Sequence, residues 1–181
     1  MIREGKASFI NYNKRNIQNA AHKQKQVQVF GRYAELKSGR PSKETFSHID
    51  LPSQNMEGDG LACSGAWVAF PWKVGGGGKI VVKRADQFGK CHSSDAGLSG
   101  HEGEILDLAF SPFNDFLLGS ASLDGTIRLW ELPVEGALTE QATESRTTLA
   151  GHSNKVQLIR WNTLANNILA SGSAKGEVLV W

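Results

Sequence analysis

The chain has 181 residues, of which 40% are hydrophobic and 21% are charged, a composition that is normal for a folded globular protein and excludes disorder throughout. No apolar run approaches the ~20 residues that a membrane-spanning helix needs. The net charge of +2 conceals an asymmetry, because the first 43 residues hold ten Lys or Arg and two Glu, whereas the rest holds ten basic and sixteen acidic residues. The positive charge therefore belongs to the N-terminal segment.

Residues 1–28 are rich in Asn, Gln and Lys and show no sustained amphipathic period. This composition predicts a disordered, basic leader. Such a leader is either an electrostatic arm for an acidic partner or a solvated extension without a role, and we favour the second interpretation. We expect the folded part of the chain to cover residues 29–181.

Four consecutive glycines, residues 75–78, stand between an apolar run, Ala66–Phe70, and a β-branched run, Ile80–Val82. A phosphate-binding loop needs a hydroxyl residue directly after its Gly-Lys pair, but Ile80 follows Lys79 here. A dinucleotide-binding loop also fails, because the third glycine position is again Ile80. Strand, glycine turn and strand therefore predict a β-hairpin.

The two cysteines, Cys63 and Cys91, have neither the pairing nor the spacing of a disulfide framework or a CxxC motif, so we expect free thiols. His92 follows Cys91 and suggests a zinc site, which is the less favoured interpretation. We expect no metal and no cofactor.

An internal repeat occupies the C-terminal part of the chain. Residues 100–130 align without a gap on residues 151–181, at an offset of 51, and Gly-His opens and Trp closes each copy. Each copy reads as three short strands separated by turns, and residues 147–150 supply a fourth strand. Four antiparallel strands with Gly-His and Trp at these positions resemble the WD repeat, which forms one blade of a β-propeller.

In blades that the repeat resembles, a hydrogen-bond relay of His, Asp, Ser and Trp satisfies buried polar groups. The corresponding residues of the two copies are His101, Asp124, Ser120 and Trp130, and His152, Ser171 and Trp181. In the second copy Lys175 stands where the Asp is required, so we predict a broken relay and a less rigid blade. We assign His101 and Asp124 a structural role in preference to acid–base catalysis.

The sequence therefore predicts an all-β fold, a partial and truncated WD-repeat β-propeller of about three blades, each a four-stranded antiparallel sheet. We expect blade 1 at about residues 46–90, blade 2 at about 100–150 and an incomplete blade 3 at about 151–181. Three blades cannot close a ring, which needs about four to eight. The open ends would expose strand edges, so the chain is either truncated or completed by other chains, and we favour truncation.

The order of features over residues 29–181 resembles the coronin family of actin-binding propellers. The stretches that carry the resemblance are Val29–Gly31, Ala66–Trp72 with the glycine run, residues 100–139 and residues 149–169. The resemblance implies a non-enzymatic protein of the cytoplasm and cytoskeleton that binds actin filaments and supports their organisation. It also implies further blades and a C-terminal extension beyond Trp181.

One feature departs from the coronin pattern. Coronins carry a basic residue just before the first hairpin, whereas Ile49–Asp59 is acidic and contains neither Arg nor Lys. The remaining basic candidates for actin contact on the early blades are Arg32, Lys37, Arg40, Lys43, Lys83 and Arg84. Each of them is alternatively an ordinary solvated surface charge.

The alternative function is a generic WD-repeat scaffold that binds other proteins through its propeller faces and does not bind actin. An enzyme would need a nucleophile with its base, or a metal cluster, in one pocket, and the five scattered histidines provide neither. Nucleic-acid binding through the basic leader is less favoured than actin binding.

Overall fold

The computed structural model of the chain describes residues 45–52 and 58–181. The predicted leader and the candidates Arg32, Lys37, Arg40 and Lys43 lie outside these residues. The described part contains strands and no helix, so none of its segments is a helix that could cross a membrane. The prediction of an all-β fold is therefore confirmed.

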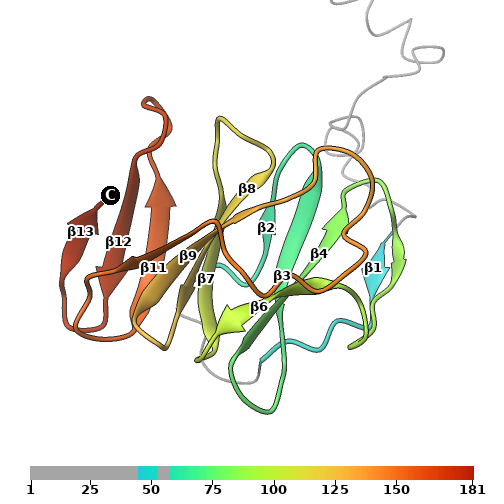
Figure 1. Cartoon of the computed structure of the whole chain (residues 1–181), viewed down its shortest axis with the longest axis horizontal. Coiled ribbons are helices and arrows are strands. Elements are labelled where there is room, and N and C mark those ends of the chain that lie inside the picture. Colours follow the sequence, from blue (N-terminus) through green and yellow to red (C-terminus); the bar gives the residue numbers. More distant parts are fainter. Residues whose placement is uncertain (1–44, 53–57) are drawn as a thin grey trace, which may run out of the picture. The chain divides into compact units, whose positions relative to one another are not determined.

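Three antiparallel sheets follow one another along the chain (Figure 1). The first has the order β2 (Ala62–Cys63), β3 (Trp67–Trp72), β4 (Gly78–Arg84) and β6 (Gly97–His101). The second contains β7 (Ile105–Phe110), β8 (Leu117–Ser122), β9 (Thr126–Glu131) and β10 (Thr147–Ala150). The third contains β11 (Val156–Trp161), β12 (Leu169–Ser173) and β13 (Val178–Val180). The short strands β1 (Phe46–Ser47) and β5 (Gly89–Lys90) pair in parallel beside them.

The glycine run closes the predicted hairpin between β3 and β4, which pair from Trp67 with Arg84 to Trp72 with Lys79. Gly77 has a φ of 68°, a left-handed conformation that glycine adopts without strain. A Cβ on Gly78 would lie 2.6 Å from the carbonyl oxygen of Gly103, so the strand that follows needs a residue without a side chain. The glycines therefore turn the chain and let it approach the second sheet.

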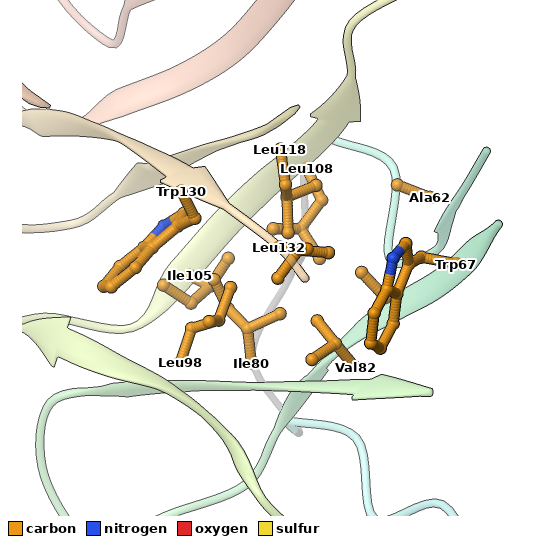
Figure 2. Packing of buried hydrophobic residues seen from close by; sticks show 11 residues of the cluster. Ala62, Trp67, Ile80, Val82, Leu98, Ile105, Leu108, Leu118, Trp130 and Leu132 are labelled. Carbon is orange, nitrogen blue, oxygen red and sulfur yellow. The ribbon is translucent and has the colours of Figure 1, made fainter. Parts of the chain in front are cut away.

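Two apolar clusters hold neighbouring sheets together, as expected for packed blades. The first joins the first and second sheets and is built around the fully buried indoles of Trp67 and Trp130, with Ile80 and Leu108 between the sheets (Figure 2). The second joins the second and third sheets around Ile159 and other small aliphatic side chains. Strand β11 packs against β7 and β8, so consecutive sheets lie side by side in chain order (Figure 1).

The connection from β9 to β10 extends from the second sheet over the first, where Figure 1 draws it in orange. The N–H of Ser99 in β6 donates to the carbonyl of Ala142 at 2.8 Å, and the N–H of Ala142 donates to the carbonyl of Gly97 at 2.9 Å. These bonds satisfy backbone groups on the outer edge of β6. The first sheet includes β6, which begins at Gly97. The sequence analysis expected the first blade to end at about residue 90.

Candidate functional site

The structure brings together four side chains of the second sheet in one hydrogen-bonded chain. Nδ1 of His101 lies 2.8 Å from Oδ2 of Asp124, and its Nε2 lies 2.8 Å from Oγ of Ser120. The indole N–H of Trp130 donates to the same Oγ at 2.8 Å. Because the carboxylate of Asp124 can only accept, His101 donates the proton of Nδ1 to it, and in the neutral imidazole Nε2 then accepts the hydroxyl proton of Ser120.

Asp124 anchors this relay at the tight turn between β8 and β9. Burial alone would raise the pKa of Asp124, but hydrogen bonds from His101 and from the hydroxyl and N–H of Thr126 outweigh it and hold the pKa below its ordinary value. Its Oδ2 also accepts the N–H of Glu102 at 3.1 Å. The carboxylate therefore ties the start of the repeat to the turn before β9.

The order Asp124, His101 and Ser120 is that of an acid, base and nucleophile, but its surroundings differ from those of a catalytic triad. Ser120 is fully buried and its hydroxyl already has the imidazole and the indole as partners. The surface hollow beside Asp124 is not lined by Ser120. A nucleophile must reach its substrate, so this geometry supports a structural relay.

Acid should weaken this relay. Since the pKa of Asp124 is lower in the folded chain than in the unfolded chain, its contribution to stability is present above the ordinary Asp pKa, about 3.9, and is lost as the pH falls through the folded value. We expect D124N to be less stable than the wild type at pH 7, and the difference to shrink as the pH falls below about 4. Thermal melts of both chains across pH 2–7 measure this, and a constant difference would contradict it.

In the third sheet part of the predicted relay is present. Nε2 of His152 lies 2.6 Å from Oγ of Ser171, which accepts the indole N–H of Trp181 at 2.8 Å. The sequence predicted a broken relay because Lys175 replaces the acid, and Lys175 is indeed exposed and away from the imidazole's hydrogen bonds. Nδ1 of His152 has no hydrogen bond in the described structure, and Oε2 of Glu177 lies 3.5 Å from it.

Two of the basic actin-contact candidates lie at the end of β4 and have partners within the first sheet. Nζ of Lys83 lies 2.7 Å from Oδ2 of Asp95. Burial alone would raise the pKa of Asp95, but the hydrogen bonds from Lys83 and from the N–H of His92 outweigh burial and lower that pKa. The guanidinium of Arg84 stacks over the indole of Trp67, 5.2 Å from its centroid. Both charges thus help to hold the sheet, and only part of each side chain faces solvent.

Near these residues lies Cys91, whose thiol is buried and whose pKa is raised chiefly by that burial. Cys63 is exposed, and both cysteines are free. Within the described residues no group of three or more His, Cys, Asp or Glu is arranged to hold a metal ion, and His92 does not join Cys91 in such a group.

The sequence analysis missed a buried carboxylate in β7. Asp107 has no solvent exposure and accepts the backbone N–H of Asp59, ahead of the first sheet, at 2.8 Å. It also accepts the N–H of Ile159 at 2.8 Å and the guanidinium of Arg160 at 2.7 Å, both from β11. Asp107 thus links the second sheet to the third and to the segment ahead of the first. The available signal was an acid within an otherwise apolar, buried strand.

A hollow of about 350 Å³ opens on the surface between the second and third sheets. Its lining comes from the turn between β8 and β9 and from the segment that leads into β11, namely Leu123, Asp124, Gly125, His152, Ser153, Asn154 and Lys155. Gly125 has a φ of 82° and faces the carbonyl of Asn154 closely. The two relays therefore support the two walls of this hollow.

Comparison with known families assigns most of the described chain. Residues 37–90 match the family described as a domain of unknown function, DUF1899, and residues 89–131 match the WD domain, G-beta repeat family. The second match contains the whole relay of the second sheet. The first contains the hairpin with the four glycines.

Several proteins are similar to the chain over most of its length. The chain is 34% identical over 145 residues to Coronin-2A of Bos taurus and 29% identical over 153 residues to the Coronin-like protein of Saccharomyces cerevisiae, in each case over 79% of its length. The crystal structure of the WD40 domain from Toxoplasma gondii coronin superposes with a TM-score of 0.71 and 36% identity over 77% of the chain. The chain spans only 27% and 24% of the two relatives and 36% of the crystallised domain.

Proposed function

Because the chain matches the N-terminal part of the coronin WD-repeat propeller, we propose that it is a non-enzymatic, coronin-type module that binds actin filaments and supports actin organisation in the cytoplasm. The observation that carries the proposal is the agreement of sequence and fold with coronins over more than three quarters of the chain. Its propeller faces would bind other proteins as well.

The basic N-terminal part supports this proposal on electrostatic grounds. Actin filaments are acidic, so a positively charged segment raises the association rate and makes binding depend on salt. Lys83 and Arg84 have partners inside the first sheet, which leaves less of their charge for a filament. We therefore assign the filament contact chiefly to Arg32, Lys37, Arg40 and Lys43.

A specific observation favours a second candidate, the generic WD-repeat scaffold without actin binding. The segment before the hairpin lacks a basic residue, and within it the carboxylate of Asp59 forms an ion pair with Arg160, with 3.3 Å between Oδ2 and Nη2. The surface hollow between the second and third sheets would then receive part of another protein.

Co-sedimentation with actin filaments separates the two functions. We expect the 181-residue chain to pellet with filaments, with less pelleting as salt rises, and to stay soluble in a parallel spin without actin. Replacing Arg32, Lys37, Arg40 and Lys43 by Ala should weaken binding on the order of tenfold, because exposed ion pairs contribute about 0.2–1 kcal/mol each.

The matched control replaces Lys73, Lys90 and Lys175, which are exposed, and should leave binding unchanged. A chain that stays in the supernatant beside filaments at low salt would contradict actin binding and favour the scaffold. Equal losses in both variants would contradict the assignment of the contact to the N-terminal basic residues. Pelleting without actin would show self-association through strand edges instead.

A further inference from the structure

The third sheet lacks the acid of the repeat but has another one nearby. By the offset of 51 residues, Lys175 corresponds to Asp124 and Glu177 corresponds to Thr126. The side chain of Lys175 is exposed, whereas the carboxylate of Glu177 is turned to the His end of the relay. The acid of the third sheet therefore stands two residues later in its repeat than the acid of the second sheet, on the other side of the turn that leads to β13.

The contacts of Glu177 match those of Asp124 in kind. Oδ2 of Asp124 accepts the N–H of the residue after His101 at 3.1 Å, and Oε2 of Glu177 accepts the N–H of Ser153, the residue after His152, at the same distance. Each carboxylate also accepts a hydroxyl, from Thr126 at 2.7 Å in one sheet and from Ser153 at 2.8 Å in the other. These bonds lower the pKa of Glu177 to about 2, with the Ser153 hydroxyl as the largest cause.

The imidazole of His152 needs an acceptor at this place. Its side chain is 1% exposed, and Nδ1 has no hydrogen bond in the described structure. Oγ of Ser171 accepts the indole N–H of Trp181 and lies 2.6 Å from Nε2 of His152. When this hydroxyl donates to Nε2, the ring proton of the neutral imidazole is on Nδ1. Oε2 of Glu177, at 3.5 Å, faces that proton.

We propose that Glu177 is the positioning residue of the third sheet: it replaces the missing relay acid, holds His152 in the tautomer that serves Ser171, and fixes the turn at Ser153. A glutamate serves because its longer side chain reaches back over Gly176, whose φ of 79° makes the turn as Gly125 does in the second sheet. Oγ of Ser173 donates to the same carboxylate at 3.2 Å and orients it.

The contacts of Glu177 also affect the hollow on the surface of the molecule. Ser153 and its neighbour Asn154 form one wall of the hollow between the second and third sheets. The opposite wall, at Leu123 and Gly125, is fixed by Asp124. With Glu177 in place both walls are held by a carboxylate, and the hollow keeps its shape despite the Lys at position 175.

The test is the variant E177Q, which keeps the length of the side chain and removes its charge. We expect the indole N–H of Trp181 to exchange with solvent on the order of tenfold faster, since loss of the carboxylate weakens the chain of hydrogen bonds through His152 and Ser171 that holds it. The ¹⁵N shifts of His152 should move toward a mixture of tautomers. The indole N–H of Trp130, which belongs to the second sheet, is the internal reference and should not change.

Two further variants decide the interpretation. E140Q removes an exposed carboxylate of the loop before β10 and should behave as the wild type. K175D/E177T rebuilds in the third sheet the Asp-Gly-Thr turn of the second, and should restore both the Trp181 exchange rate and the His152 tautomer. E177Q spectra identical to those of the wild type would overturn the proposal. A K175D/E177T chain with the same Trp181 exchange rate and His152 tautomers as E177Q would also overturn it. If E177Q unfolds the whole chain, a K175D/E177T chain that unfolds as well would overturn the proposal.

Discussion

Replacing Trp130 by Ala should destabilise the chain by about 3–5 kcal/mol, the usual cost of deleting a large buried aromatic side chain. The indole is 1% exposed and packs in the cluster that joins the first and second sheets. The same substitution removes the indole N–H that donates to Ser120, the hydroxyl that also bonds to His101. The loss therefore combines a cavity with a damaged relay.

Urea unfolding followed by far-ultraviolet circular dichroism measures this change. Two variants separate its parts. W130F keeps most of the ring volume and loses the N–H, so we expect a smaller loss of about 1–3 kcal/mol. W181A deletes the equivalent indole of the third sheet, which is only partly buried, and should cost less than W130A. A loss below about 1 kcal/mol for W130A would contradict a buried relay.

The second sheet and its relay were predictable because their roles follow fixed positions of the repeat. Once Gly-His and Trp were aligned, the places of Ser120 and Asp124 followed, and their side chains meet where the alignment puts them. The hairpin was predictable for a similar local reason, since a glycine run between two apolar runs has few other uses. Local pattern thus fixes the strands and the turns.

Contacts between distant parts of the chain were not predictable in this way. Lys83 pairs with Asp95 in the segment before β6, and the backbone of Ala142 hydrogen-bonds to the edge strand β6. Both contacts form because the chain folds back on itself. Glu177 was missed because the repeat alignment tests only the equivalent position, whereas a longer side chain reaches the same point from two residues away. The alignment specifies positions in sequence, but a hydrogen bond depends on positions in space.

The carboxylate of Asp107 shows the same limit and carries the second large prediction. We expect D107A to destabilise the chain by about 3–5 kcal/mol, as the loss of one partner from a buried charged network does. The N–H of Ile159 would lose its acceptor inside the protein, and an unsatisfied buried donor costs about 1–3 kcal/mol. The partly buried N–H of Asp59 would lose the same acceptor, so the second sheet should loosen from the third and from the segment ahead of the first.

Arg160 provides the matched control, because it shares the interaction but is itself 56% exposed. R160A leaves Asp107 with three backbone donors, the N–H groups of Asp59, Leu108 and Ile159. The loss of stability in R160A should therefore be clearly smaller than in D107A. The double variant should resemble D107A alone, since without Asp107 the exposed guanidinium keeps only a surface ion pair with Asp59, which contributes little. Urea unfolding of the three chains gives this comparison. If R160A costs as much as D107A, the ion pair holds the sheets and the backbone bonds to Asp107 do not.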